Sequence, residues 1–291
     1  MKFENPGIPG AVRITTGNEG PHVALFGGIH GDEVSGVHAI EKLLFDFFGG
    51  ARALKRGRLT LVRGNELALA ADRRYVKHNL NRLFRKDYGA AVDKASYEFA
   101  RAQQLKTILE NCDYFLDLHS APIAQEPFMV AEQSVADFFA RLGVPRIITG
   151  WSKFSSGAIG GDAENYASAH HAKSATLESG SHYEKRSIDV AYGAATALLS
   201  LLGLIAKTHE PPAKQAEIID MYAVLTKDFD DFRFTDAVEN FQFLKKGDIF
   251  AHQNGRPLAV LEDSYLLIPM IPDQTKIGEE ICYLGRKLAA A

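Results

Sequence analysis

The stretch "VALFGGIHGDEVSGVHAIEKLLFDFF", residues 23–48, combines three local patterns in one short run. Residues 23–26 form a continuous apolar run, which predicts a buried strand. From residue 34 onward the apolar residues recur at steps of three and four, which predicts an amphipathic helix. The glycines between them allow the chain to turn sharply and allow its backbone to approach a ligand. The stretch therefore predicts a strand that ends in a tight turn and leads directly into a helix.

Strand-like and helix-like patterns continue to alternate up to about residue 206. This alternation predicts an α/β fold with a mainly parallel or mixed sheet that is covered by helices on both faces. Further strands are expected at residues 59–62, 113–119, 146–149 and 175–177, and further helices at residues 97–109, 135–142, 163–171 and 187–206.

The character of the sequence changes after "KTHEPPAK", where Pro211 and Pro212 suggest a stiff linker. Short strand-like runs separated by turn signals then follow, which predicts a small β-rich domain. These runs are residues 217–225, 249–252, 258–261, 265–268 and 280–284. The expected division is an α/β domain at residues 1–208 and a β-rich domain at residues 209–291 that caps the active site.

Composition restricts the classes of function. The 291 residues are 46% apolar and 24% charged, with a net charge of −3. Lys and Arg do not cluster as a nucleic-acid-binding surface requires. Residues 190–206 are long enough to approach a membrane span, but they contain polar residues and glycines, so a helix packed on a sheet is expected instead. Two distant cysteines and no apparent signal peptide favour a cytoplasmic protein. The sequence leaves homo-oligomerisation open.

Three potential metal ligands follow predicted strands. His30 and Glu33 lie just after the first strand, and His119 closes the strand "FLDLH". In open α/β sheets, ligands bind at the carboxyl ends of the strands. Two imidazoles and one carboxylate suit a catalytic zinc ion, which needs three protein ligands and one open position. Asp117, two residues before His119 on the same face, could orient a ligand.

Two further elements supply chemistry for a hydrolase. Glu178 ends the apolar strand in "ATLESG", and a carboxylate there is a candidate proton shuttle. The segment "RRYVKHNLNRLFR" carries Arg74, Asn81 and Arg82. A guanidinium can hold a carboxylate through two parallel hydrogen bonds, and it can stabilise an oxyanion.

The motifs "GGIHGDEVSG", "RYVKHNLNRLF", "FLDLHS" and "TLESG" resemble, in that order, those of the succinylglutamate desuccinylase and aspartoacylase family, a branch of the zinc carboxypeptidase-like clan. The resemblance implies a carboxypeptidase-like mixed sheet followed by a small β-rich domain. It implies one zinc ion per chain, held by the two histidines and the glutamate of the first and third motifs. The implied reaction is hydrolysis of a small N-acyl amino acid, with succinylglutamate and N-acetylaspartate as examples.

The same resemblance implies roles for individual residues. Glu178 is the proton shuttle, and Arg74 polarises the scissile carbonyl and stabilises the oxyanion. Asn81 and Arg82 hold a carboxylate of the amino-acid half of the substrate.

The sequence also departs from the family pattern. Asn79 stands where aspartoacylases commonly carry aspartate, and "YASAHHAK" lacks the arginine that they use for a second carboxylate. His170 and His171 in this segment are candidates for the acyl pocket, while Tyr265 is the nearest candidate for a tyrosine that closes the pocket. The other unmatched histidines are expected to be surface or helix residues: His22, His38, His78, His209 and His252. The acyl group stays open.

Two alternatives remain on sequence grounds. One is a metallocarboxypeptidase that trims peptides, and the other is a non-catalytic module that binds an acidic ligand through its arginines. A binding module has no need of Glu178, and a capping domain would exclude long peptides.

Overall fold

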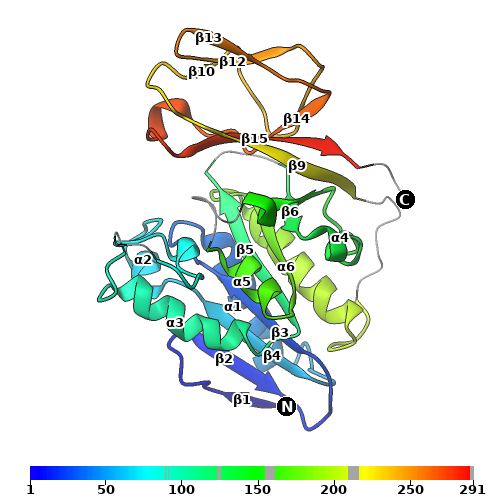
Figure 1. Ribbon diagram of the computed structural model, residues 1–291. Helices are drawn as coiled ribbons and strands as arrows, with labels where there is room; N and C mark the ends of the chain where they lie inside the picture. The colour runs from blue at the N-terminus through cyan, green and yellow to red at the C-terminus, as the bar shows by residue number, and fades with distance from the viewer. Residues whose placement is uncertain (89, 91, 123–125, 155–160, 209–215, 289–291) are drawn as a thin grey trace.

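The computed structural model describes residues 1–88, 90, 92–122, 126–154, 161–208 and 216–288 (Figure 1). Within these residues, twelve strands form one sheet in the order β1-β2-β4-β3-β5-β8-β6-β7-β9-β15-β14-β11. Their bounds are β1 Lys2–Glu4, β2 Ala11–Thr15, β3 His22–Gly27, β4 Arg58–Arg63, β5 Tyr114–Ala121, β6 Phe128–Ala131, β7 Arg146–Thr149, β8 Lys173–Ser181, β9 Glu217–Thr226, β11 Gln242–Leu244, β14 Ser264–Leu267 and β15 Glu280–Lys287. A smaller sheet joins β10 (Arg233–Phe234), β12 (Ile249–Gln253) and β13 (Arg256–Ala259).

Helices cover both faces of the first part of the large sheet (Figure 1). Helices α1 (Val34–Phe48), α4 (Gln133–Ala140) and α6 (Lys185–Leu201) pack on one face, while α3 (Tyr97–Leu109) and α5 (Ala163–Ala169) pack on the other. Three shorter elements, α2 (Glu66–Ala70), η1 (Leu80–Arg82) and η2 (Trp151–Phe154), lie in the connections, and η3 (Pro272–Gln274) precedes β15.

Strand β3 shows why a continuous apolar run forms a central strand. Val23 and Leu25 point into the core beneath α1 and α6, while Ala24 and Phe26 point into the core beneath α3 and α5. All four side chains are fully buried, as expected for a strand that is covered on both faces. Strand β3 is parallel to β4 and β5, and β5 is parallel to β8, so the carboxyl ends of these strands meet at one edge of the sheet.

The sheet runs without a break into the β-rich C-terminal part. Strand β9 pairs in parallel with β7 through its first residues, and it pairs with β15 in antiparallel along its length. The predicted β-rich character of this part is confirmed, and its core is separate from the two clusters under the helices. The expected linker at residues 211 and 212 lies outside the described residues. The division at residue 208 therefore stays a prediction.

Some elements differ from the sequence-based expectation. The last helix ends at Leu201 rather than at residue 206, because Gly203 adopts a φ of +68° and closes the helix. The N–H of Gly203 donates to the carbonyl of Ser200, and that of Leu204 donates to Leu199, which is the glycine-terminated end typical of helices. The sequence analysis missed the strands β1, β2, β6, β10 and β11 and the helix α2. In the described part of the chain, no helix is long and apolar enough to cross a membrane.

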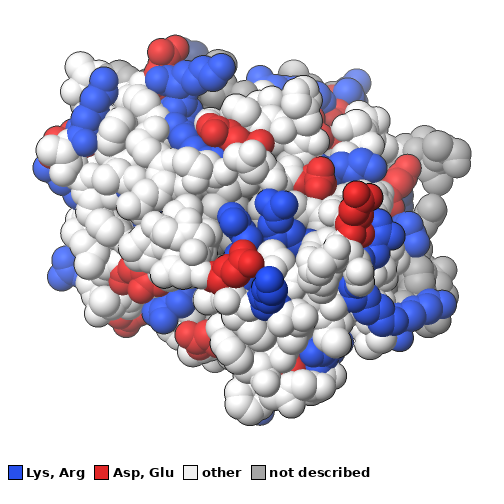
Figure 2. Space-filling model, turned by 90° about the horizontal axis from the view of Figure 1, so that it is seen from below, with Lys and Arg blue, Asp and Glu red and all other residues white. Residues whose placement is uncertain are grey.

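The underside of the molecule carries charges of both signs (Figure 2). Lys and Arg side chains are interspersed there with Asp and Glu side chains. Among the described residues on this face, they form no single broad basic surface of the kind that nucleic acids need.

His22 is a buried histidine at the start of β3, so its expected place on a surface or helix is wrong. Its Nδ1 lies 2.5 Å from the carbonyl oxygen of Asn111, and its Nε2 lies 2.8 Å from Oγ1 of Thr60. Because a carbonyl oxygen can only accept, Nδ1 carries the proton, and Nε2 accepts from the Thr60 hydroxyl. Burial lowers the pKa of His22 to about 4, so the folded protein keeps this ring neutral.

We expect His22 to make folding pH-dependent. The unfolded chain protonates this ring below the usual histidine pKa of 6.5, whereas the folded chain does so only near pH 4. The stability is therefore fully present above pH 6.5 and is lost as the pH falls between these two values. Between pH 7 and pH 5 the free energy of unfolding should fall by about 2 kcal/mol from this group. Urea unfolding at both pH values measures the loss.

The matched control for this experiment is the exposed His38 on α1. His22→Gln should remove about 2 kcal/mol of the loss between pH 7 and pH 5, whereas His38→Gln should leave the loss unchanged. If the loss in His22→Gln equalled that of the unaltered protein, the assigned role of His22 would be wrong.

Candidate active site

The turn between β3 and α1 brings two polar side chains to the carboxyl edge of the sheet. Gly28 has a φ of +73°, a conformation that favours glycine. Gly31 lies against the backbone of Ala68 in α2, where a Cβ would come within 2.1 Å of the carbonyl carbon. This close packing fixes the turn and buries His30 and Glu33, each with only 3% of its surface exposed.

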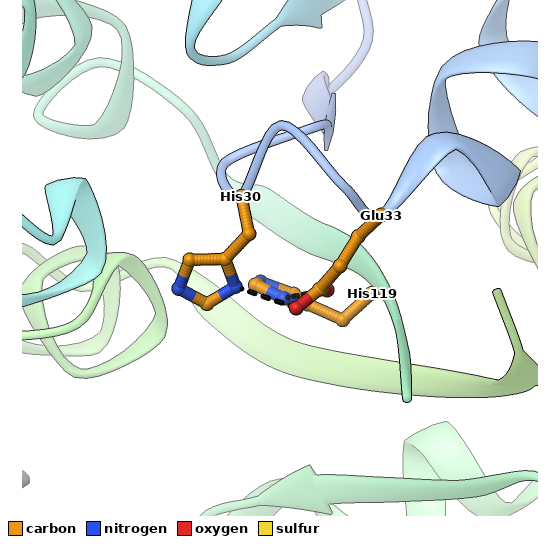
Figure 3. A group of neighbouring side chains, drawn as sticks. All are labelled: His30, Glu33 and His119. Atoms are coloured by element: carbon orange, nitrogen blue, oxygen red, sulfur yellow. Dashed lines mark hydrogen bonds and ion pairs between the residues drawn. The ribbon is translucent and has the colours of Figure 1, made fainter. Parts of the chain in front are cut away.

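Three predicted side chains meet at this edge (Figure 3). Nδ1 of His30 lies 2.7 Å from Oε1 of Glu33, and Nδ1 of His119 lies 2.8 Å from Oε2 of the same carboxylate. One potential ligand atom from each side chain lies within 4.8 Å of the others. His119 comes from β5, 86 residues after Glu33, so the fold brings distant parts of the sequence to one point. The three side chains could hold a metal ion.

The second ring nitrogen of each histidine faces an oxygen atom. Nε2 of His30 lies 3.1 Å from Oδ1 of Asn79. Nε2 of His119 lies 2.9 Å from Oδ2 of the fully buried Asp117, although the direction of approach is not that of a hydrogen bond. Oxygen atoms at these positions orient both rings with Nδ1 toward Glu33, as outer partners do for metal-binding histidines.

The charges of the three side chains depend on one another. Burial alone would raise the pKa of Glu33, but His30 and His119 hold it well below its usual value. Burial would lower the pKa of His119, but Asp117 and Glu33 raise it well above the usual value. Burial and the charge of Arg74 lower the pKa of His30 to about 4. The site thus contains a carboxylate, a neutral imidazole, and a second imidazole between two carboxylates.

Glu178 lies beside His119 in the sheet, since these two residues are partners in the parallel register of β5 and β8. Partners in register point to the same face of a sheet. Oε2 of Glu178 is buried and has no hydrogen-bond partner among the described residues. Burial and the negative charge of Glu33 raise the pKa of Glu178 to about 8. This carboxyl group can therefore exchange a proton near neutral pH.

Arg74 reaches the same site from the segment between α2 and η1. Its Nη1 donates to Oε1 of Glu33 over 2.9 Å, while 46% of its side chain remains exposed to solvent. A guanidinium has five N–H groups, so the remaining donors can serve a bound molecule.

Asn81 and Arg82 lie on η1, next to the start of α5. Oδ1 of Asn81 accepts the N–H of Ala163 over 3.0 Å, and Nη1 of Arg82 donates to the backbone carbonyl of Asn81 over 3.0 Å. The structure gives neither residue a direct contact with the histidines or Glu33. Their role toward a substrate stays a prediction.

The sequence analysis missed His182, which lies just beyond the end of β8. Its Nδ1 lies 2.8 Å from Oγ of Ser120, and it forms a second group of potential ligands with Asp32 and Glu33. The sequence signal was its position four residues after Glu178. Asn79 was noticed only as a departure from the family pattern, although it faces His30.

Tyr265 does not reach this site. Its hydroxyl donates to Oε1 of Glu217 over 3.2 Å. Another tyrosine of the C-terminal part, Tyr283 on β15, packs on Trp151 with the ring centres 5.0 Å apart. Burial raises the pKa of Tyr283, while the positive charge of Arg82 acts in the opposite direction, so the two side chains lie within electrostatic range.

His170 and His171, which the sequence analysis offered as candidates for the acyl pocket, lie away from this site. Nδ1 of His170 lies 2.8 Å from the backbone carbonyl oxygen of Tyr166 at the end of α5. His171 lines a surface hollow with Tyr114, at the amino end of β5. Since His119 lies five residues further along this strand, about 17 Å away, neither histidine borders the carboxyl edge of the sheet.

Comparisons with known proteins show which family this chain resembles. A model of the succinylglutamate desuccinylase/aspartoacylase catalytic domain matches residues 19–201. A succinylglutamate desuccinylase from Shewanella sp. (strain W3-18-1) is 28% identical over 275 residues, which cover 84% of this chain and 76% of that protein.

Solved structures share the fold. The succinylglutamate desuccinylase from Vibrio cholerae superposes with a TM-score of 0.77 at 22% identity, covering 96% of this chain and 85% of that one. A product-bound ectoine utilization protein from Ruegeria pomeroyi gives a TM-score of 0.72 at 20% identity, covering 94% and 88% of the two chains. The expected fold class is confirmed by these similarities. Because the matched catalytic domain spans more than half of the sequence, the chain belongs to the succinylglutamate desuccinylase/aspartoacylase family, whose named members are deacylases.

Proposed function

We propose that the protein is a zinc-dependent amidohydrolase that cleaves the amide bond of a small N-acyl amino acid. The observation that carries the proposal is the meeting of His30, Glu33 and His119 at one point. Glu178 lies beside them in the sheet, and its buried Oε2 has no hydrogen-bond partner among the described residues.

The donor set fits zinc. Two imidazole nitrogens and one carboxylate oxygen are the protein ligands of many catalytic zinc sites, and they leave one position open. Nδ1 of His30 and His119 would bind the ion together with Glu33, since the other nitrogen of each ring faces Asn79 or Asp117. When bound, zinc lowers the pKa of water and polarises a carbonyl group.

Glu178 and Arg74 supply the remaining chemistry. Glu178 takes a proton from the attacking water and delivers it to the leaving nitrogen, which its raised pKa permits near neutral pH. Arg74 is held by Glu33 through one N–H, and its other N–H groups stabilise the negative charge that develops on the carbonyl oxygen.

The substrate is proposed to carry a carboxylate on its amino-acid half. Arg82 and Asn81 are the candidates to bind it, because a guanidinium matches a carboxylate in charge and geometry. The identity of the acyl group is left open, since the family arginine expected near residues 166–173 is absent from the sequence.

A panel of N-acyl amino acids tests this proposal. The zinc-loaded protein should release a free amine from N-acetyl or N-succinyl derivatives of aspartate or glutamate, and blocking the α-carboxylate as an amide should weaken cleavage. Arg82→Met should raise KM about 10- to 100-fold, since hydrogen bonds to charged groups contribute about 1.5 to 3 kcal/mol. The matched control is Arg73→Met, because Arg73 is an exposed arginine nine residues earlier.

Two outcomes would contradict the proposal. If the fully zinc-loaded protein cleaved no member of the panel, the assigned hydrolysis would be wrong. If it cleaved a decapeptide faster than the matching dipeptide, it would be a carboxypeptidase rather than a deacylase.

We also propose a cytoplasmic location. Cys112 and Cys282 are both buried free thiols, which suits a reducing compartment.

A further inference from the structure

The segment that carries Arg74 and Asn79 connects α2 to η1 without forming a helix or strand of its own. A catalytic arginine must nevertheless be held within a fraction of an ångström of its productive position. Hydrogen bonds to three backbone groups, those of Arg74, Val76 and Lys77, show how this irregular segment is fixed.

The first contact fixes the backbone of Arg74 itself. Its carbonyl oxygen accepts the N–H of Gly31 over 3.2 Å. Gly31 lies in the same turn as His30 and Glu33, so this bond ties the arginine segment directly to the turn with the predicted metal ligands.

The second contact comes from Glu98 in the first turn of α3. Oε1 of Glu98 accepts the N–H of Val76 over 2.7 Å and the N–H of Lys77 over 3.1 Å. Hydrogen bonds to a carboxylate are stronger than those to a neutral acceptor, and the start of a helix favours a negative charge. One oxygen atom thus satisfies two consecutive backbone donors in a segment without regular structure.

Glu98 is fully buried, with 0% of its surface exposed. Its second oxygen, Oε2, is also buried and has no hydrogen-bond partner among the described residues. A buried carboxylate with one oxygen left without a hydrogen bond destabilises the folded state. Stability alone would therefore favour a neutral side chain at this position.

We propose that Glu98 is a positioning residue that holds the backbone just after Arg74 and thereby sets where its guanidinium meets Glu33. The proposal rests on the catalytic role of Arg74 given above. Glu98 itself has no contact with Glu33 or the two histidines in the structure, so its effect on turnover would pass through Arg74.

Hydrogen exchange tests the physical part without any substrate. Glu98→Met removes the acceptor at similar side-chain size, and the amides of Val76 and Lys77 should then exchange at least about tenfold faster. Glu98→Gln keeps an acceptor oxygen, so it should largely restore the protection. If exchange at these two amides were the same in Glu98→Met as in the unaltered protein, the proposal would be overturned.

Kinetics test whether the effect passes through Arg74. Glu98→Met should lower kcat about 10- to 100-fold with little change in KM, because a displacement of about 1 Å can cost about 100-fold. In an Arg74→Ala background the same change should lower kcat less than about threefold, since the group to be positioned is gone. A purely structural role would give the same factor in both backgrounds and would overturn the proposal.

If Glu98→Met does not fold, Glu98→Asp can be measured instead. Glu98→Asp keeps the charge but withdraws the acceptor by one carbon–carbon bond, so it should give intermediate losses in protection and in kcat. Unchanged protection and kcat in Glu98→Asp would contradict the proposal. The exchange result stands even if the protein proves not to be a hydrolase, so failure of the proposed function and failure of the positioning role can be told apart.

Discussion

Replacing Glu178 with glutamine is expected to lower kcat by about two to four orders of magnitude while leaving zinc binding unchanged. An amide of nearly the same shape can neither take up nor release a proton at neutral pH. Glu178 lies next to His119 in register, and one of its oxygens is buried without a partner among the described residues. The measurements are kcat on the best substrate of the panel and the zinc content per chain.

The pH profile gives a second test of the same variant. Burial and the charge of Glu33 raise the pKa of Glu178 to about 8, and a bound cation would offset Glu33 and lower it again. If Glu178 acts as a base, kcat/KM should fall as the pH drops through its pKa in the loaded protein, and this limb should disappear in Glu178→Gln.

A nearby glutamate supplies the control for that experiment. Glu184 is exposed at the start of α6, six residues after Glu178, and Glu184→Gln should keep full activity. If Glu178→Gln retained kcat within about threefold, another group would have to move the proton.

The sequence predicts the central part of the fold because its strands are apolar on both faces. The run at residues 23–26 and the helix that follows it are recognisable, since burial on both sides of a sheet leaves no polar position in the strand. Strand β6 (Phe128–Ala131) was missed, because a four-residue apolar run has no periodicity that separates a strand from other buried segments. The pairing of β9 with both β7 and β15 depends on long-range contacts that no local pattern contains.

The site was predictable for a related reason. His119 and Glu178 lie near the ends of apolar strands, and His30 and Glu33 lie in the turn that follows another one. The parallel sheet brings these strand ends together. His182 also follows a strand, but no further motif in the sequence indicates that it lies beside other potential ligands. Glu98 has no sequence signal beyond its place at the start of a predicted helix, and only the tertiary structure shows that its carboxylate accepts hydrogen bonds from another segment.

Replacing His119 with alanine is expected to weaken zinc binding by more than about 100-fold, since loss of even an outer partner of a ligand costs about 10- to 100-fold. In this variant only two of the three proposed protein ligands, His30 and Glu33, would remain. Competition with a chromophoric chelator measures the affinity, and the rise in Tm on adding zinc should disappear with it. His38→Ala is the matched control, because His38 is an exposed histidine on α1 that pairs with Glu41.

The pH dependence of zinc binding distinguishes His119 from His30. Asp117 and Glu33 raise the pKa of His119 well above its usual value, so this ring holds a proton more tightly than an ordinary histidine and must lose it before zinc can bind. His30, with a pKa of about 4, is already uncharged at neutral pH. Zinc affinity should therefore fall as the pH decreases from 8 to 6, by up to about tenfold per pH unit, with up to about one proton released per ion bound. Affinity that stayed constant over this range, or that survived in His119→Ala, would exclude the ring of His119 as a ligand.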